Sequence, residues 1–281
     1  MQAADVEQAE LAWDRAYRQM RADHGYPTPE RTADVVDMGV RRFEYLRRGD
    51  PGGSWVAVDG SEVVGVAQSH VRGPTWVLAV LGVIPEHQER GTGRMLLDAA
   101  VRYGAPAPRG VVFASPDARA THRYVTAGFE MHPCGAAYGA LRTAVAEPEG
   151  IHNGSGADVD VLGAVDRAVR GSERPDDLRF MVASGSDLLV DDDNRGYAVV
   201  RGGRLSTLAA LDDDTAIRLM TMAMARCPSG QPFDVSWLHA RQQWAFRTLA
   251  AAGVSLSTHE SIMVRGPWLP ALPYLPNGVF G

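Results

Sequence analysis

The spacing of apolar and polar residues along the chain predicts a mixed α/β protein. Residues 5–20 place their apolar side chains on one helical face, and a second helical pattern covers 32–48. The apolar runs 54–58 and 62–68 predict a tight β-hairpin. Residues 75–84 are almost wholly apolar, which predicts a strand buried on both faces.

Much the same order of elements then occurs twice. In the first half we predict a helix at 91–103, a strand at 110–114, a helix at 116–127 and further short strands from 129. In the second half we predict helices at 158–170 and 174–183, a hairpin of strands 197–200 and 204–211, a helix at 214–227, a strand at 233–237 and a helix at 242–252. The Gly-, Pro- and Ser-rich stretch 146–156 indicates a connection, so we expect two α/β copies, in domains 1–145 and 146–281.

The residues that join the strand at 75–84 to the helix at 91–103 form a candidate anion site. Glycines in this stretch let a ligand approach the backbone, and the free amides of a first helical turn favour a negative charge. Such a site can bind a diphosphate through its backbone amides, without a lysine side chain. A Gly-x-Gly pair alone is equally typical of a tight turn. The stretch reads Gln88-Glu89-Arg90-Gly91-Thr92-Gly93-Arg94.

A second motif, Tyr124-x-x-x-Gly128-Phe129, closes the helix at 116–127. Together with Pro85 and the Gln-x-x-Gly-x-Gly stretch, its order and spacing over residues 54–132 resemble the GNAT superfamily of acetyl-CoA-dependent acyltransferases. The whole chain also resembles tandem two-domain members of this superfamily from actinobacteria, which end in a Tyr-Leu-Pro-x-Gly pattern like 274–278 here. The resemblance implies two tandem GNAT-like domains of mixed sheet, the second one degenerate.

The resemblance also implies roles for individual residues. The backbone amide of Val83 would polarise the thioester carbonyl and stabilise the oxyanion, and Tyr124 would protonate the departing thiolate. Packing of its helix on the sheet is the alternative role for Tyr124. Ser115 would cap its helix and touch the pantetheine arm. The arm would pair with Leu81, Gly82 and Val83 where two strands splay apart, and the pyrophosphate would lie on the amides of Gln88, Glu89, Arg90, Gly91, Thr92, Gly93 and Arg94.

One departure concerns the general base. Many members of the superfamily carry a Glu on the strand that corresponds to 76–81, where this chain has no titratable residue. An ammonium acceptor must lose a proton before it attacks, so a water chain or another segment has to take that proton. The candidates, each of them more simply a solvated side chain, are Glu86, His87, Asp37, Glu44 and His70.

The second copy lacks the features of a coenzyme site. Asp212, Asp213 and Asp214 replace the glycine loop, and Leu249 stands in the position of Tyr124. Carboxylates at a helix start suit the helix dipole but would repel a pyrophosphate. We therefore expect a degenerate domain that cannot bind coenzyme A in the usual way.

A wall for the acceptor pocket is the role we expect for this second domain. Trp237, His239 and Gln243 lie around a predicted strand end and helix start, and they are candidate substrate contacts. The alternative is that Trp237 belongs to the core and His239 to an exposed loop. The apolar segment 267–281 is expected to dock across the domain junction.

Composition narrows the possible partners. The 281 residues contain no lysine, and 28 arginines against 34 acidic residues leave a net charge of −6. This excludes Schiff-base and Walker-type lysines and argues against nucleic acid and anionic membranes as partners. Cys134 and Cys227 form no disulfide framework or metal motif, so we predict no metal. Without a leader-like start or an apolar run long enough to span a bilayer, we expect a cytoplasmic protein.

These observations predict an acyl-CoA-dependent N-acyltransferase in which the amine of a small molecule attacks the thioester directly. Acetyl-CoA is the expected co-substrate. Two other functions stay open: a GNAT-like enzyme whose acyl group comes from a carrier protein, and a non-catalytic acetyl-CoA sensor. The sequence is compatible with a monomer or a homodimer.

Overall fold

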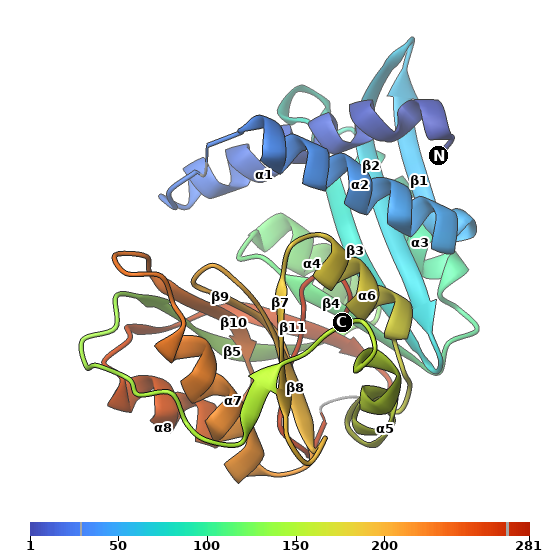
Figure 1. Cartoon of the computed structure of the whole chain (residues 1–281). Coiled ribbons are helices and arrows are strands. Elements are labelled where there is room, and N and C mark those ends of the chain that lie inside the picture. Colours follow the sequence, from blue (N-terminus) through green and yellow to red (C-terminus); the bar gives the residue numbers. More distant parts are fainter. Residues whose placement is uncertain (29, 268–269) are drawn as a thin grey trace. The chain divides into compact units, whose positions relative to one another are not determined.

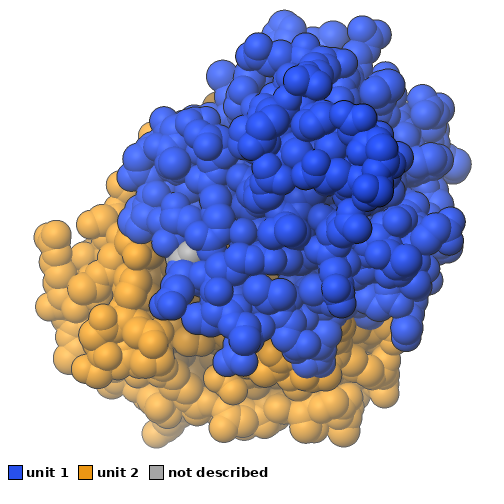
Figure 2. Space-filling view, turned by 90° about the horizontal axis from the view of Figure 1, so that it is seen from above, with its two compact units in different colours: residues 1–129, 264–266, 281 blue, residues 130–263, 267–280 orange. Residues whose placement is uncertain are grey.

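In a computed structural model the chain consists of helices packed on mixed β-sheet, described for residues 1–28, 30–267 and 270–281 (Figure 1). It divides into two compact units (Figure 2). Unit 1 comprises Met1–Phe129, Val264–Gly266 and Gly281, and unit 2 comprises Glu130–Met263 and Pro267–Phe280. Within the described ranges, every helix is too short or too polar to cross a membrane.

Unit 1 is built on four neighbouring strands in chain order. These are β1 (Ser54–Asp59), β2 (Glu62–Arg72), β3 (Thr75–Val83) and β4 (Arg109–Ala114). Strand β2 is antiparallel to both β1 and β3, and β4 runs parallel to β3. Its helices are α1 (Val6–Asp23), α2 (Ala33–Gly49), α3 (Thr92–Tyr103) and α4 (Ala118–Thr126), with short 3-10 turns at Ala3–Asp5, Pro51–Gly53 and Pro85–His87.

Helices α1 and α3 cover opposite faces of β3. A Cβ added at Gly82 would lie 3.3 Å from the Cβ of Ala16 in α1. A Cβ added at Gly65, which pairs with Val83, would lie 2.9 Å from Leu96 in α3. Gly82 and Val83 are consecutive, and consecutive strand residues face opposite sides of a sheet. The strand is therefore enclosed on both sides, which explains its continuous apolar sequence.

Unit 2 contains the remaining elements. Its strands are β5 (Glu130–Gly139), β6 (Ile151–Asn153), β7 (Asp187–Asp191), β8 (Gly196–Arg201), β9 (Arg204–Ala210), β10 (Phe233–Leu238), β11 (Leu256–Arg265, whose last two residues belong to unit 1) and β12 (Tyr274–Leu275). They follow the order β11-β5-β10-β9-β8-β7-β6, and β12 pairs with β9. Its helices are α5 (Val159–Arg170), α6 (Pro175–Ala183), α7 (Asp213–Ala225) and α8 (Gln243–Ala251).

The predicted repeat is visible in the ends of two equivalent helices. After α4, the amide of Phe129 donates to the carbonyl of Tyr124 at 3.1 Å, and after α8 the amide of Val254 donates to Leu249 at 3.1 Å. Each helix is followed by a glycine with positive φ, at Gly128 in one unit and at Gly253 in the other. Such a left-handed residue is the usual C-terminal stop of a helix.

Four strands depart from the sequence-based expectation. The local pattern does not predict β6, β7, β11 or β12. Residues after Phe129 form one strand, β5, instead of several short ones, and β5 pairs with β10 in unit 2. The units consequently divide at 129/130, whereas the predicted domains divide at 145/146. Strand partners distant in sequence cannot be inferred from local periodicity.

The C-terminal segment contains a strand that the sequence does not predict. We expected residues 267–281 to dock across the domain junction. Trp268 and Leu269 lie outside the described residues. Tyr274 and Leu275 pair with β9, and both are buried inside unit 2. These two residues are an added strand of unit 2, whereas Gly281 is assigned to unit 1.

A glycine in unit 1 provides a test of this packing. A Cβ at Gly53 would lie 2.0 Å from the backbone oxygen of Ser69 in β2, so Gly53→Ala must displace the start of β1. We expect a loss of about 2 kcal/mol, seen as a melting temperature lower by roughly 4–8 °C. Gly49→Ala is the control, because a Cβ there meets only the tip of Arg72 at 4.0 Å. Equal melting temperatures for the two variants would contradict the packing.

Candidate active site

Strands β3 and β4 separate halfway along their length. Their parallel register runs from Thr75 opposite Arg109 to Leu78 opposite Val112 and ends there. The next residue, Ala79, is a β-bulge, because Leu78 and Val80 pair with the consecutive residues Ser69 and Gln68 of β2. A bulge bends a strand and increases its twist. Residues 79–83 thus continue beside β2 but no longer pair with β4.

The backbone amide of Val83 points toward the edge that β4 has left. The amide of Ile84 donates to the carbonyl of Val64 in β2 at 3.0 Å. Since the amides of consecutive strand residues point to opposite edges, the amide of Val83 is directed away from β2. Its side chain lies near the start of α3, where a Cβ at Gly93 would be 3.6 Å from Val83 Cγ2.

The start of α3 has the conformation expected of an anion site. Gly91 is the N-cap residue, with a left-handed φ of +85°, and it has no side chain with which to cap the helix. The amides of Arg94 and Met95 donate to its carbonyl at 3.0 and 3.1 Å. The amides of Thr92 and Gly93 belong to the first turn, which has no intrahelical acceptors for them. They are suited to an external acceptor at the positive end of the helix dipole.

Arginine side chains surround this helix start unequally. The side chain of Arg94 is 82% exposed and lies 3.8 Å from Asp98, and Arg90 is also exposed. Half-buried Arg123 of α4, which the sequence reasoning missed, lies closest: a Cβ at Gly93 would be 2.6 Å from its Nη1. Arg123 belongs to the motif around Tyr124, but the sequence does not show that its guanidinium lies beside Gly93.

Gln88 joins the loop to the two elements on either side. Its side-chain amide donates to the carbonyl of Val83 at 2.9 Å, and its Oε1 accepts from Arg119 of α4 at 2.8 Å. Asp117 in turn accepts from the amide of Arg119 at 2.8 Å as the N-cap of α4. The expectation that Ser115 caps this helix is wrong, because the helix begins only at Ala118. Ser115 is half-buried directly after β4.

Tyr124 is buried in α4. Its side chain is 6% exposed, and its ring meets Phe129 edge-on at 6.5 Å between centroids. Burial raises the pKa of Tyr124, with the Asp117 carboxylate adding to the effect, so the hydroxyl keeps its proton at every physiological pH. Burial suits the packing role, whereas a raised pKa makes the hydroxyl a weaker acid, so catalysis by Tyr124 stays a prediction.

The predicted alternatives for the general base lie in different environments. Glu44 accepts hydrogen bonds from Arg47 at 2.7 Å and from Arg48, and the bond from Arg47 is the main reason that its pKa falls to about 2. Glu86 pairs with Arg15 at 2.9 Å. Both are therefore weak bases. His70 is fully buried in β2, whereas the carboxylate of Asp37 is exposed 3.9 Å from Arg41, and half-buried His87 lies 3.9 Å from Asp59.

The three predicted substrate contacts lie at the end of β10 and the start of α8. Trp237 is half-buried, and its amide donates to Glu260 at 2.8 Å. His239 is buried rather than exposed, with its Nε2 2.9 Å from the side-chain amide of Gln242. Gln243 is exposed, and it donates to the carbonyl of Ala240. Contact with an acceptor stays a prediction for all three.

Residues 13–129 match the acetyltransferase (GNAT) family. This match covers less than half of the chain and lies within unit 1. It contains every residue to which we assigned coenzyme binding or catalysis. No curated protein matches the sequence significantly.

Solved structures share the fold at low sequence identity. A proposed acetyltransferase from Pyrococcus horikoshii has a TM-score of 0.78 and 17% identity, over 100% of this chain and 94% of that one. A GCN5-related N-acetyltransferase from Sphaerobacter thermophilus has a TM-score of 0.61 and 16% identity, over 99% and 96%. Eis1 from Mycobacterium abscessus has a TM-score of 0.53 and 16% identity, over 93% and 72%.

The buried histidine at the start of α8 makes stability depend on pH. Burial, together with Arg241 and His132, lowers the pKa of His239 to about 4. The unfolded chain, with a pKa near 6.5, binds the proton first, so folding loses up to about 3 kcal/mol as the pH falls from 6.5 to 4. We expect the melting temperature of the wild type to fall more steeply over this interval than that of His239→Gln. Parallel curves would contradict the assignment.

Proposed function

We propose that the protein is an acyl-CoA-dependent N-acyltransferase that uses acetyl-CoA and the amine of a small molecule. One observation carries the proposal: the amide of Val83 points to the strand edge that β4 leaves, beside the glycine-capped start of α3. A strand edge suits the two amides of a pantetheine arm, and a helix start suits a pyrophosphate. Acyl-CoA carries both groups in one molecule.

Binding in this proposal relies on backbone groups. Leu81, Gly82 and Val83 pair with the arm along the edge of β3. The amides of the 88–94 loop hold the pyrophosphate, and Arg123 adds positive charge next to Gly93. Gln88 fixes the position of the loop relative to β3 through its hydrogen bond to the Val83 carbonyl. These contacts explain how a chain without lysine can hold a diphosphate.

Chemistry in this proposal needs two groups of the chain. Acetyl-CoA supplies the acyl thioester. The amide of Val83 donates to the thioester oxygen as negative charge develops there, a contribution of about 3 kcal/mol in other acyl transfers. Tyr124, whose hydroxyl is protonated at neutral pH like that of any tyrosine, gives its proton to the departing thiolate. The acceptor amine loses its own proton to water or to a segment other than β3, since 76–81 carries no base.

A bulky residue at Gly93 tests coenzyme binding. The new side chain in Gly93→Val would collide with Arg123 and approach Val83, so it would crowd the proposed pyrophosphate and arm contacts. We expect the Kd for acetyl-CoA, measured by calorimetry, to rise at least ten-fold. Met95→Ala is the control, because Met95 is 63% exposed two residues later. A wild type that does not bind, or a variant that binds equally well, would contradict the proposal.

Tyr124→Phe tests the chemical step separately. The ring and its contact with Phe129 remain, so we expect an unchanged Kd for acetyl-CoA and a kcat about 100-fold lower. The measurement is thiol release with a panel of amines. Unchanged turnover would refute Tyr124 as the acid. Binding without turnover for every amine in the wild type would favour a sensor, and turnover only with a carrier-bound thioester would favour that donor.

A further inference from the structure

Unit 2 contains a strand edge that corresponds to the proposed coenzyme edge of unit 1. The hairpin β8–β9 pairs Gly196 with Ala210, as β2–β3 pairs Gly65 with Val83. Strand β9 has the same bulge at the same distance from this pair, at Ser206. Ala210 is therefore the counterpart of Val83.

Strand β9 also leaves its parallel neighbour as β3 does. The register of β9 with β10, both fully described, consists of Arg204 opposite Asp234, two residues before the bulge at Ser206. The amide of Leu211 donates to Arg195 at 2.9 Å, as that of Ile84 donates to Val64. The amide of Ala210, one residue earlier, is consequently directed toward the edge that β10 has left.

In unit 2 this edge is already occupied by the chain itself. The amide of Ala210 donates to the carbonyl of Pro273 at 3.0 Å. Tyr274 then pairs with Ala209, and Leu275 with Leu208, so that β12 runs antiparallel along β9. Strand β12 also contacts β10. A peptide carbonyl thus accepts from the amide that corresponds to the proposed oxyanion donor.

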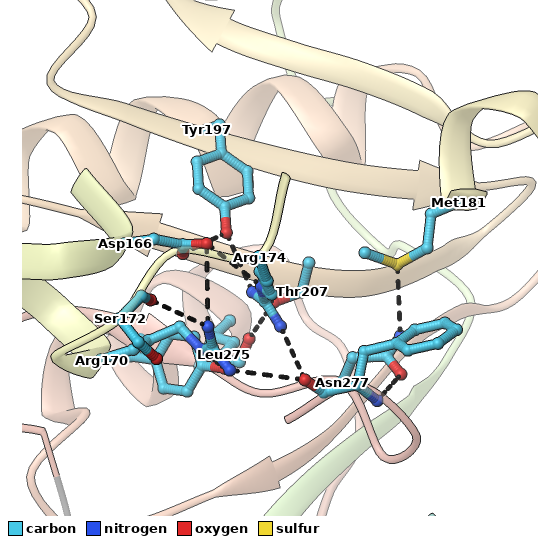
Figure 3. Close-up of polar contacts among 11 residues, drawn as sticks. Asp166, Arg170, Ser172, Arg174, Met181, Tyr197, Thr207, Leu275 and Asn277 are labelled. Atoms are coloured by element: carbon cyan, nitrogen blue, oxygen red, sulfur yellow. Dashed lines mark hydrogen bonds and ion pairs between the residues drawn. The ribbon is translucent and has the colours of Figure 1, made fainter. Parts of the chain in front are cut away.

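Side chains of unit 2 hold the residues 273–278, which we call the insert segment (Figure 3). Arg170 donates to the hydroxyl of Tyr274 at 3.0 Å, and Thr207 donates to the carbonyl of Leu275 at 2.8 Å. Asn277 donates to the carbonyl of the bulge residue, Ser206, at 3.4 Å. These polar contacts fix both the register of the segment and its direction.

The far end of the insert segment fits against an aromatic side chain. A Cβ added at Gly278 would lie 2.3 Å from the indole of Trp237. Gln242, itself buried, contacts the backbone at the other end of the segment: its Oε1 is 3.3 Å from the amide of Tyr274, and its Nε2 is 3.4 Å from the carbonyl of Leu272. Trp237, a predicted acceptor contact, and Gln242, next to another in sequence, thus contact the chain's own C-terminal residues.

A buried charge makes this occupant part of the folded state. Arg174 is fully buried and donates to Tyr197 at 2.9 Å and to the carbonyl of Phe280 at 3.4 Å. Its guanidinium lies 5.7 Å from the ring centre of Tyr274 and 3.4 Å from Asp166. A buried guanidinium that loses its partners costs several kcal/mol. Departure of the insert segment together with Phe280, which follows it, would remove two of these contacts at once.

The helix start of unit 2 is also capped by the chain. Asp212 accepts from the amide of Thr215 at 2.8 Å and pairs with Arg195 at 2.7 Å. The equivalent N-cap position in unit 1, at the start of α3, is occupied by Gly91. The pyrophosphate position and the arm position of unit 2 therefore both have occupants from the chain.

We infer that the cleft between β9 and β10 is a peptide-binding site whose ligand is the insert segment, with the sequence Pro-Tyr-Leu-Pro-Asn-Gly. The chain accordingly binds one acyl-CoA. The analogy with the coenzyme arm rests on the proposed function of unit 1, whereas occupancy by a peptide rests on the contacts of unit 2 alone.

Cutting the chain in its folded state tests this inference. A specific protease site is inserted after exposed Ala271, and the purified protein is cleaved. We expect the released peptide to stay bound through gel filtration. A labelled synthetic peptide of residues 272–281 should exchange into the cut protein and leave the intact chain unlabelled. A Gly278→Val peptide should bind at least ten-fold more weakly because of Trp237, and a Val279→Ala peptide should bind about as well as the parent.

Several outcomes would overturn the inference. These are loss of the peptide without a change in melting temperature, equal labelling of intact chain, and two acetyl-CoA molecules bound per intact chain. If the inserted site prevents folding, the full-length variants decide: Gly278→Val must melt lower than Val279→Ala, and equal melting temperatures overturn the inference. The peptide results do not depend on acetyl-CoA, so they stand even if unit 1 fails to bind it.

Discussion

A single extra residue in the second strand of a hairpin determines the architecture of both units. Ala79 in β3 and Ser206 in β9 are bulges, and they lie one and two residues, respectively, after the last residue paired with the parallel neighbour. Beyond the bulge the backbone keeps its antiparallel partner on one side and loses its parallel partner on the other. Buried backbone amides need acceptors, so an edge of this kind requires an occupant.

The two units meet this requirement in different ways. In unit 2 the insert segment supplies the acceptors, and Asp212 caps the neighbouring helix. In unit 1 the corresponding edge ends at Val83, and the helix begins with Gly91. We interpret the edge of β3 in unit 1 as the one that binds a substrate. On this account the second unit changed from a coenzyme site to a peptide site without losing the bulge that creates it.

Local sequence predicts the helices, the hairpins and the glycine loop because each depends on residues near one another. Periodicity identifies β2 and β3, and the Gln-x-x-Gly-x-Gly stretch identifies the start of α3. Side-chain links such as Gln88 to Val83 and Arg123 to Gly93 depend on distances that spacing does not contain. The N-cap of α4 is Asp117 and not the predicted Ser115. Serine and aspartate are both good N-cap residues, so the choice between them depends on the first residue of the helix, which the sequence does not fix.

Strand partners far apart in sequence were the least predictable part. The two residues of β12 lie between prolines and have no strand periodicity, and their pairing with β9 comes from the edge that the bulge creates. The most direct test of this account is residue-resolved hydrogen exchange at the amides of Val83 and Ala210. Without ligand, Ala210 should be protected and Val83 should exchange readily, and acetyl-CoA should slow the exchange of Val83 at least ten-fold while leaving Ala210 unchanged. Strong protection of Val83 without ligand, or an effect of acetyl-CoA on Ala210 alone, would contradict the account.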